Sequence, residues 1–202
     1  MADSTHYAAI LMFGYPGCGK GTQGVVLGRM PNLVHLAMGD IFRALDKQSE
    51  IGKEFLSYST KGQLVPDELT VRVFRHHVEG RIRAGEVRPD YHTLILDGIP
   101  RTVRQVELLR GIIDVHRIVH LKMNDKEALV ARLSGRAAKQ GRPDDADRGV
   151  IRNRIDVYER ETAPVLGSYD VGLIRDINAD QHPLGVLRDV AAALIDVVPG
   201  VI

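Results

Sequence analysis

A glycine-rich turn between an apolar run and a helical stretch constrains the fold of this chain more than any other part of its sequence. Residues 10–23 read ILMFGYPGCGKGTQ, so an apolar segment leads into glycines at positions 14, 17, 19 and 21. Glycine adopts positive φ angles readily, which lets such a turn wrap its backbone closely around a ligand. The N–H groups of the turn and the positive end of the following helix form a site for phosphate oxygens.

The turn follows the pattern G-x-x-x-x-G-K-[ST] from Gly14 to Lys20, except that Gly21 comes before Thr22. In such loops the lysine follows a phosphoryl group during its transfer, and the hydroxyl reaches a Mg²⁺ ion. A glycine-rich turn in a core without any ligand is the alternative. The agreement of the apolar run, the spacing, the lysine and the helix favours a phosphate-binding loop.

The composition is that of an ordinary globular domain and excludes several classes of protein. The 202 residues are 44% hydrophobic and 26% charged, which predicts one domain with a proper core. A formal net charge of +1 argues against a nucleic-acid partner. No signal-peptide layout and no membrane-length apolar run are present, so we expect no membrane contact and a cytoplasmic location. Cys18 is the only cysteine, which excludes an internal disulfide and suits a reducing compartment.

Short apolar runs alternate with longer helical stretches along the chain, which predicts an α/β doubly wound fold with a parallel sheet. Ligands of such folds gather beyond the carboxyl ends of the strands. The expected strands cover residues 7–13, 33–36, 92–96, 117–121 and 171–174. The expected helices cover about residues 20–30, 40–47, 50–60, 67–84, 103–113, 125–138, 146–162 and 184–196.

The segments that follow the expected strands are therefore the places to look for function. Residues 94–97 read LILD, a buried strand that ends in Asp97. In phosphate-loop proteins an acid at this place holds Mg²⁺, directly or through water. An aspartate that starts a turn or caps a helix is the alternative. After the strand at 117–121, Asn124 and Glu127 form a capping box, which is a structural feature alone.

Arginines gather in the second half of the chain. Arg132 and Arg136 lie one turn apart on the same side of an expected helix, and residues 135–143 predict a short basic loop after it. Asp144 and Asp145 then suit the start of a new helix. Arg154 shares a face of that helix with apolar residues, so it needs an anionic partner. That partner is either a structural carboxylate or a bound phosphate.

Several segments of the chain form a set with a characteristic order and spacing, and they are residues 14–23, Gly39-Asp40 with Arg43, residues 62–68, residues 97–102 with Gln105, and residues 132–154. In this order and spacing the chain resembles the adenylate kinases. The resemblance covers nearly the whole chain and implies the reversible reaction Mg·ATP + AMP ⇌ 2 ADP, with Mg²⁺ bound together with ATP. It also implies a monomer with a three-layer phosphate-loop NTPase fold, built on a five-stranded parallel sheet flanked by helices.

The resemblance divides this single domain of residues 1–202 into a core and two mobile parts. The core comprises residues 1–36, 67–134 and 144–202. A helical segment that binds the nucleoside monophosphate covers about residues 37–66. A short lid covers about residues 135–143, and it lacks the four metal ligands of some bacterial members, so no structural zinc is expected.

The resemblance also implies which residues bind each nucleotide. For ATP they are Gly17, Cys18, Gly19, Lys20, Gly21, Thr22, Arg132, Arg136 and Gln181. For AMP they are Met38, Gly39, Arg43, Gln63, Leu64, Val65, Gly98, Arg101, Gln105, Arg142 and Arg154. The catalytic residues are Lys20, Arg101, Arg132, Arg142 and Arg154, and the Mg²⁺ residues are Asp97, through water, and Thr22.

Some of these residues have other interpretations. Gln105 also reads as the partner of Thr102 in a capping box, and Arg43 alone reads as a solvated helix residue. Met38 stands where most adenylate kinases have threonine, and its apolar side chain can still cover a base. A UMP/CMP kinase is therefore the near alternative for the function. A nucleotide-sensing module without transfer is the more distant one, which the full set of arginines disfavours.

Overall fold

The computed structural model describes residues 6–140 and 145–199, in which strands and helices alternate along the chain. The strands are β1 (Tyr7–Gly14), β2 (Leu33–Ala37), β3 (Thr93–Asp97), β4 (Ile113–Lys122) and β5 (Ile174–Asn178). The helices are α1 (Lys20–Leu27), α2 (Met38–Ala44), α3 (Glu50–Ser59), α4 (Asp67–Arg83), α5 (Val103–Leu109), α6 (Lys126–Gln140), α7 (Arg148–Val157) and α8 (Pro183–Leu194). A π-helical turn (Tyr158–Thr162) and two 3₁₀ turns (Ala163–Ser168 and Val171–Leu173) connect α7 to β5.

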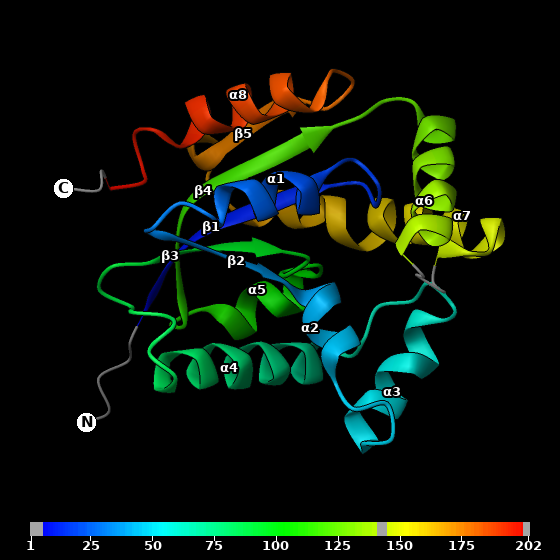
Figure 1. Ribbon diagram of the computed structural model, residues 1–202, viewed down its shortest axis with the longest axis horizontal. Helices are drawn as coiled ribbons and strands as arrows, with labels where there is room; N and C mark the ends of the chain where they lie inside the picture. Colours follow the sequence, from blue (N-terminus) through cyan, green and yellow to red (C-terminus); the bar gives the residue numbers. More distant parts are fainter. Residues whose placement is uncertain (1–5, 141–144, 200–202) are drawn as a thin grey trace.

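Within the described residues, five strands form one parallel sheet in the order β2-β3-β1-β4-β5 (Figure 1). The strand that leads into the glycine-rich turn, β1, is the central one. Ala9 pairs with Leu94 of β3 and Met12 with Asp97. This register brings the end of β3 level with the end of β1, so the two segments that follow them share one edge of the sheet.

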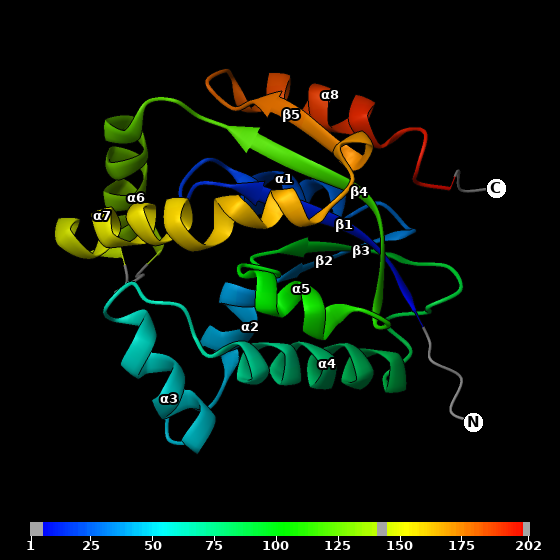
Figure 2. The ribbon, with the colours of Figure 1, turned by 180° about the vertical axis from the view of Figure 1, so that it is seen from behind.

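Side chains of β1 alternate between two hydrophobic cores, one on each face of the sheet. Leu11 and Phe13 pack on one face with residues of α4 and α5, whereas Ile10 and Met12 pack on the other with residues of α1, α6 and α8. Figures 1 and 2 show α4 and α5 below the sheet and α8 on the opposite side. The expected three-layer α/β fold with a five-stranded parallel sheet is confirmed.

Two parts extend from the end of the sheet where the glycine-rich turn lies. In both views α6 and α7 lie side by side at this end, with α3 beneath them (Figures 1 and 2). Ser49 is the N-cap of α3, and its hydroxyl accepts the N–H of Gly52 at 3.1 Å. Asp147 is the N-cap of α7, and its carboxylate accepts the N–H groups of Gly149 and Val150.

None of the helices in residues 6–140 and 145–199 is long and apolar enough to cross a membrane.

The structure corrects two of the expected strands. The run at 171–174 was expected to form the last strand, but residues 171–173 form a 3₁₀ turn and β5 begins at Ile174. The Asp170 carboxylate accepts the N–H of Gly172 at 2.6 Å, which stabilises that turn locally. The strand β4 begins at Ile113 rather than at residue 117, because Gly111 adopts a φ of 76° and ends the preceding helix early.

Three expectations around α6 and α7 are also corrected. Helix α6 continues through Gly135 to Gln140, so residues 135–140 are not a loop, because the residues after Gly135 favour helix. The start of α6 is capped by Asp125, which accepts the N–H of Ala128 at 2.9 Å, and not by Asn124. Asp145 does not begin α7, which starts at Arg148 with Asp147 as its N-cap; Asp145 is fully buried. Asp144 and Arg142 lie outside the described residues.

Candidate functional site

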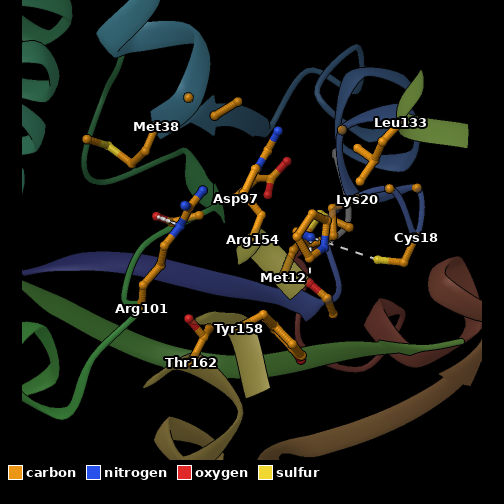
Figure 3. A pocket seen from close by; sticks show the side chains of 18 of the residues that line it. Met12, Cys18, Lys20, Met38, Asp97, Arg101, Leu133, Arg154, Tyr158 and Thr162 are labelled. Carbon is orange, nitrogen blue, oxygen red and sulfur yellow. Dashed lines mark hydrogen bonds between the residues drawn. The ribbon is translucent and has the colours of Figure 1, made fainter. Parts of the chain in front are cut away.

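A cleft of about 1190 Å³ opens at the carboxyl ends of β1 and β3, between the part that contains α2 and α3 and the part that contains α6 and α7. Among the described residues, it brings together all the cationic side chains that the sequence singled out. Figure 3 shows Lys20, Arg101 and Arg154 entering it from different elements. The expected site residues along its wall are Gly17, Cys18, Gly19, Lys20, Gly21, Thr22, Met38, Gly39, Arg43, Gln63, Leu64, Val65, Asp97, Gly98, Arg101, Gln105, Arg132, Arg136, Arg154 and Gln181.

The glycine-rich turn has the backbone geometry of a phosphate cradle. Gly14, Gly17 and Gly19 adopt φ angles of 137°, 86° and 111°. A Cβ atom at Gly14 would lie 2.5 Å from the backbone oxygen of Leu121, so both the angle and the close packing require glycine there. Helix α1 begins directly after the turn, at Lys20, so its N-terminal N–H groups face the cleft.

The Lys20 ammonium lies over the turn. It donates hydrogen bonds to the backbone oxygens of Gly14 at 2.7 Å and Tyr15 at 2.9 Å. It also lies 3.8 Å from the Cys18 sulfur, as the dashed line in Figure 3 shows. Burial raises the pKa of the Cys18 thiol, so the thiol stays protonated at neutral pH. The turn therefore presents one positive charge, with no thiolate beside it to neutralise it.

Asp97 ends β3 beside the start of α1. A Cβ atom on Gly21 would lie 3.7 Å from its Oδ2 atom, which places the carboxylate next to the segment that contains Thr22. Carboxylate and hydroxyl oxygens are the hard donors that Mg²⁺ takes in proteins, so the residues present fit this ion. His35 lies behind Asp97, with its Nε2 atom 3.9 Å from Oδ2. Burial lowers the pKa of His35, so the ring is neutral at physiological pH.

Arg101, Gly98 and Gln105 form a compact group after β3. The Arg101 Nε atom donates a 3.0 Å hydrogen bond to the backbone oxygen of Gly98. A Cβ atom on Gly98 would lie 2.7 Å from the Arg101 guanidinium, and Gly98 has a φ of 85°. The side-chain oxygen of Gln105 accepts the N–H of Arg101 at 2.7 Å, and its amide donates to Asp67 at 2.9 Å. Only half of the capping box forms, because Thr102 accepts the N–H of Gln105 while Gln105 bonds Arg101 instead.

Another part of the cleft wall comes from α2 and the segment after α3. Arg43 forms an ion pair with Asp40 at 2.5 Å and lines the cleft, so it is not simply a solvated helix residue. Met38 also lines the cleft but is only 2% exposed, because its side chain packs in the core below α2. Gln63 is exposed, whereas Leu64 and Val65 are half-buried.

The arginines of α6 and α7 meet at a buried carboxylate. The Arg136 Nε atom donates a 2.7 Å hydrogen bond to Asp145, and Arg154 donates to the other oxygen of the same carboxylate. Asp145 is 0% exposed, whereas the two arginine side chains are 26% and 20% exposed. The structure therefore supplies a carboxylate partner for Arg154, and both guanidinium groups still line the cleft. Arg132 lies one turn earlier on α6, with its Nη1 atom 3.4 Å from the Met123 sulfur.

Gln181 lines the cleft from the segment before α8. Its side-chain amide donates to the backbone oxygen of Asn178 at 2.9 Å and to the carboxylate of Asp189 at 2.7 Å. A Cβ atom on Gly185 would lie 2.5 Å from the Gln181 side-chain oxygen, so Gly185 leaves room for this arrangement. The side chain is therefore held by its own loop and helix.

Several residues of the site were not predicted from the sequence. Tyr158 and Thr162 line the cleft from the π-helical turn after α7, and His35 lies behind Asp97. A signal existed for His35, since Gly24 of α1 and Gly28, the residue that follows α1, both leave space for its side chain. No comparable signal existed for Thr162, because the π-helical turn is a local irregularity in a continuous helical pattern.

Comparison with known proteins agrees with this geometry. A family model described as "Adenylate kinase" matches residues 12–172. An adenylate kinase of Kocuria rhizophila is 41% identical over 166 residues, which are 80% of this chain and 84% of that protein. An adenylate kinase of Synechococcus sp. is 34% identical over 194 residues, which are 93% of this chain and 95% of that protein. An adenylate kinase of Leptospira biflexa is also 34% identical over 194 residues, 92% and 97% of the two chains.

Proposed function

The chain belongs to the adenylate kinase family, and we propose how its cleft carries out the reaction of that family. The protein is an enzyme that reversibly transfers a phosphoryl group from ATP to AMP, which gives two molecules of ADP. Such a transfer needs two polyphosphates held end to end and their charge neutralised, rather than covalent help from the protein. The observation that carries the proposal is the convergence of one lysine and five arginines on a single cleft, namely Lys20, Arg43, Arg101, Arg132, Arg136 and Arg154.

The glycine-rich turn is the side of the cleft that binds the donor, ATP. Its backbone N–H groups and the start of α1 hold the phosphates, and Lys20 exchanges its bonds to the backbone oxygens of the turn for bonds to them. Arg132 and Arg136 face this side from α6, and Gln181 lies at the place of the adenine. The residues proposed for ATP are Gly17, Cys18, Gly19, Lys20, Gly21, Thr22, Arg132, Arg136 and Gln181.

The opposite side binds the acceptor, AMP. Arg43 and Arg101 bind its phosphate, and the group around Gly98 and Gln105 lies at its base. Arg154 lies between the two sides, where it bridges the phosphoryl group in transfer and the AMP phosphate. The residues proposed for AMP are Met38, Gly39, Arg43, Gln63, Leu64, Val65, Gly98, Arg101, Gln105, Arg154 and Arg142, of which Arg142 lies outside the described residues.

Asp97 and Thr22 would hold the Mg²⁺ ion that accompanies ATP, Asp97 through water. When bound, this ion neutralises charge on the phosphate oxygens as it develops. His35 is neutral and buried behind Asp97, so it adds no charge to the ion's surroundings. The carboxylate oxygens of Asp97 can therefore face the start of α1, where Thr22 lies.

We further propose that residues 37–66 and residues 135–143 move as the acceptor-binding segment and the lid on a core of residues 1–36, 67–134 and 144–202. Closure of the two parts excludes water and so prevents hydrolysis of ATP. The enzyme works as a monomer in the cytoplasm, where the single buried cysteine, Cys18, stays reduced. Light scattering of the purified protein tests the monomer.

The test of the function is an assay of ADP release with ATP as donor and AMP, UMP, CMP or GMP as acceptor. AMP is expected to give the fastest turnover, because residues 64–67 and residues 102–105 resemble the family members that use AMP. Fastest turnover with UMP or CMP would overturn the assignment of AMP. Nucleotide binding without any turnover would instead indicate a sensing module.

A further inference from the structure

The side chain of Tyr15 joins the phosphate-binding turn to the helices that carry the arginines. Its hydroxyl donates a 2.6 Å hydrogen bond to the Oε1 atom of Glu159, which lies 144 positions later in the chain. The cleft wall includes Gly14 and Pro16 on either side of Tyr15 but not Tyr15 itself. Tyr15 is therefore next to the substrate-binding turn without being placed to touch a substrate.

Glu159 lies where the arginine-bearing helices join the core. It belongs to the π-helical turn that continues α7, and it forms an ion pair with Lys126 at 2.6 Å. Lys126 is the first residue of α6. One carboxylate thus connects the start of α6, the turn that continues α7 and the turn after β1.

The contact has a packed and a polar component. The rings of Tyr15 and Tyr158 lie 4.6 Å apart between centroids, with an angle of 48° between their planes. Burial and the Glu159 carboxylate raise the pKa of Tyr15 to about 12, so its hydroxyl is a donor at neutral pH. The Lys126 ammonium, and then the Tyr15 hydroxyl, lower the pKa of Glu159, so it is the ionised acceptor. A hydrogen bond to an ionised group is among the stronger ones.

The same residue also touches the catalytic lysine through its backbone. The Lys20 ammonium donates to the Tyr15 carbonyl oxygen at 2.9 Å, so a shift of Tyr15 changes the position from which Lys20 moves to the phosphates. Arg132 and Arg136 are on α6 and Arg154 is on α7, so their position relative to Lys20 depends on how these helices meet the turn. Phosphoryl transfer is sensitive to misplacement of such groups by an ångström or less.

We infer that Tyr15 is a positioning residue for phosphoryl transfer, which acts through Glu159 to hold the phosphate-binding turn in register with the arginines of α6 and α7. The inference rests on the proposed function of the cleft. It assigns Tyr15 a role in the rate of transfer and none in AMP recognition, because its contacts lie on the donor side.

The test is a double-mutant cycle of Tyr15→Phe, Glu159→Ala and the double variant, with turnover, KM for both nucleotides and thermal midpoint measured for each. Tyr15→Phe keeps the ring packing on Tyr158 and removes only the hydroxyl. We expect kcat to fall about threefold to tenfold, the size of one lost hydrogen bond, with KM for AMP unchanged. The double variant should be no slower than the slower single variant.

Tyr91→Phe is the matched control, because Tyr91 lies in a turn after α4 and its ring contacts, with Arg88 and His92, need no hydroxyl. It should keep wild-type kcat. Wild-type kcat in Tyr15→Phe, or an additive double variant, would overturn the inference while leaving the function intact. A fall in thermal midpoint without a fall in kcat would reduce Tyr15 to a structural role and so also overturn it. Absence of AMP phosphorylation by the wild-type protein would refute the proposed function itself.

Discussion

The side-chain amide of Asn153, on α7, donates a 2.7 Å hydrogen bond to the backbone carbonyl of Lys61, in the turn after α3. This bond joins the arginine-bearing part of the cleft to the part proposed to bind the acceptor. Gly62 follows directly, with a φ of 68°, and a Cβ atom there would lie 2.9 Å from Cγ of Arg154 and 3.0 Å from the backbone oxygen of Val150. The two sides of the cleft therefore meet at a position that only glycine fits.

Gly62→Ala is expected to lower both stability and turnover. The left-handed backbone of an alanine costs about 1–2 kcal/mol, and its methyl group also displaces Arg154 or the turn. We expect kcat to fall about tenfold or more, because Arg154 is moved from its place in the cleft. Steady-state kinetics and urea unfolding measure the two effects.

Gly85→Ala separates the effect of backbone strain from the effect of the contact with Arg154. Gly85 has a φ of 74° but no neighbouring atom within 4 Å of the added Cβ. This variant should lose a similar amount of stability and keep wild-type kcat. Equal losses of turnover in both variants would show that backbone strain alone, and not the contact with Arg154, slows the enzyme.

Arg101→Ala is expected to remove most of the turnover while leaving the fold intact. Arg101 is bound to Gly98 and Gln105 and lines the cleft, so its removal takes away the positive charge that we propose binds the acceptor phosphate. We expect kcat/KM for AMP to fall about 10²–10³-fold, with an unchanged circular-dichroism spectrum. Arg104→Ala is the control, because Arg104 is exposed and pairs with Glu68 and Glu107. An Arg101→Ala enzyme with wild-type turnover would refute the acceptor site proposed above.

Asp145→Asn is expected to destabilise the protein strongly. The carboxylate is fully buried and accepts hydrogen bonds from Arg136 and Arg154, so an amide in its place leaves one guanidinium facing another donor. We expect a loss of about 2–4 kcal/mol in the free energy of unfolding, measured by urea denaturation. Asp176→Asn removes an exposed carboxylate and should cost about 1 kcal/mol or less. Similar losses in both variants would contradict the structural importance of Asp145.

The stability of the protein should fall as the pH falls toward 5.5, in part because of His77. Burial, and then the charge of Arg81, lower the pKa of His77 on α4. The unfolded chain binds a proton near the ordinary histidine pKa of about 6.5, whereas the folded protein binds it only at lower pH. Unfolding therefore takes up protons below about pH 6.5, and stability is lost as the pH falls through this range.

His77→Gln should reduce this loss, seen as a smaller fall in thermal midpoint between about pH 7.5 and about pH 5.5. Burial also lowers the pKa of His35, so part of the wild-type dependence remains in the His77 variant. Identical curves for the wild type and His77→Gln would contradict the role given to His77.

The sequence predicted the parts of the fold whose signals are local. The apolar run before Gly14, the glycines of the turn and the lysine after it fix a strand, a phosphate-binding turn and a helix without reference to the rest of the chain. The last strand was misplaced because residues 171–174 form an apolar run that suits a strand, whereas the Asp170 side chain favours a short turn there. At these residues, the hydrogen bond that the Asp170 carboxylate accepts decides the local structure more than hydrophobicity does.

The candidate site was predictable as a set of residues but not as an arrangement. Nothing in the sequence near Asp145 shows that it is buried, because its burial depends on Arg136 and Arg154 approaching it from two helices. The bond between Tyr15 and Glu159 joins residues far apart in the chain, so no spacing rule could find it. The resemblance to a family predicted which residues form the site. Only the folded structure shows which hydrogen-bond and ion-pair partners those residues have.

The central place of β1 determines which half of the cleft is steadier. With β3 on one side and β4 on the other, β1 is an interior strand, as β3 and β4 also are. Edge strands and peripheral helices open more often than such a strand, at a fraction of the free energy of global unfolding. The phosphate-binding turn therefore follows an interior strand, whereas Arg43 and Gln63, which are proposed for AMP, lie on the peripheral helix α2 and after the peripheral helix α3. Gentle warming should loosen these proposed contacts with AMP before it disturbs the turn.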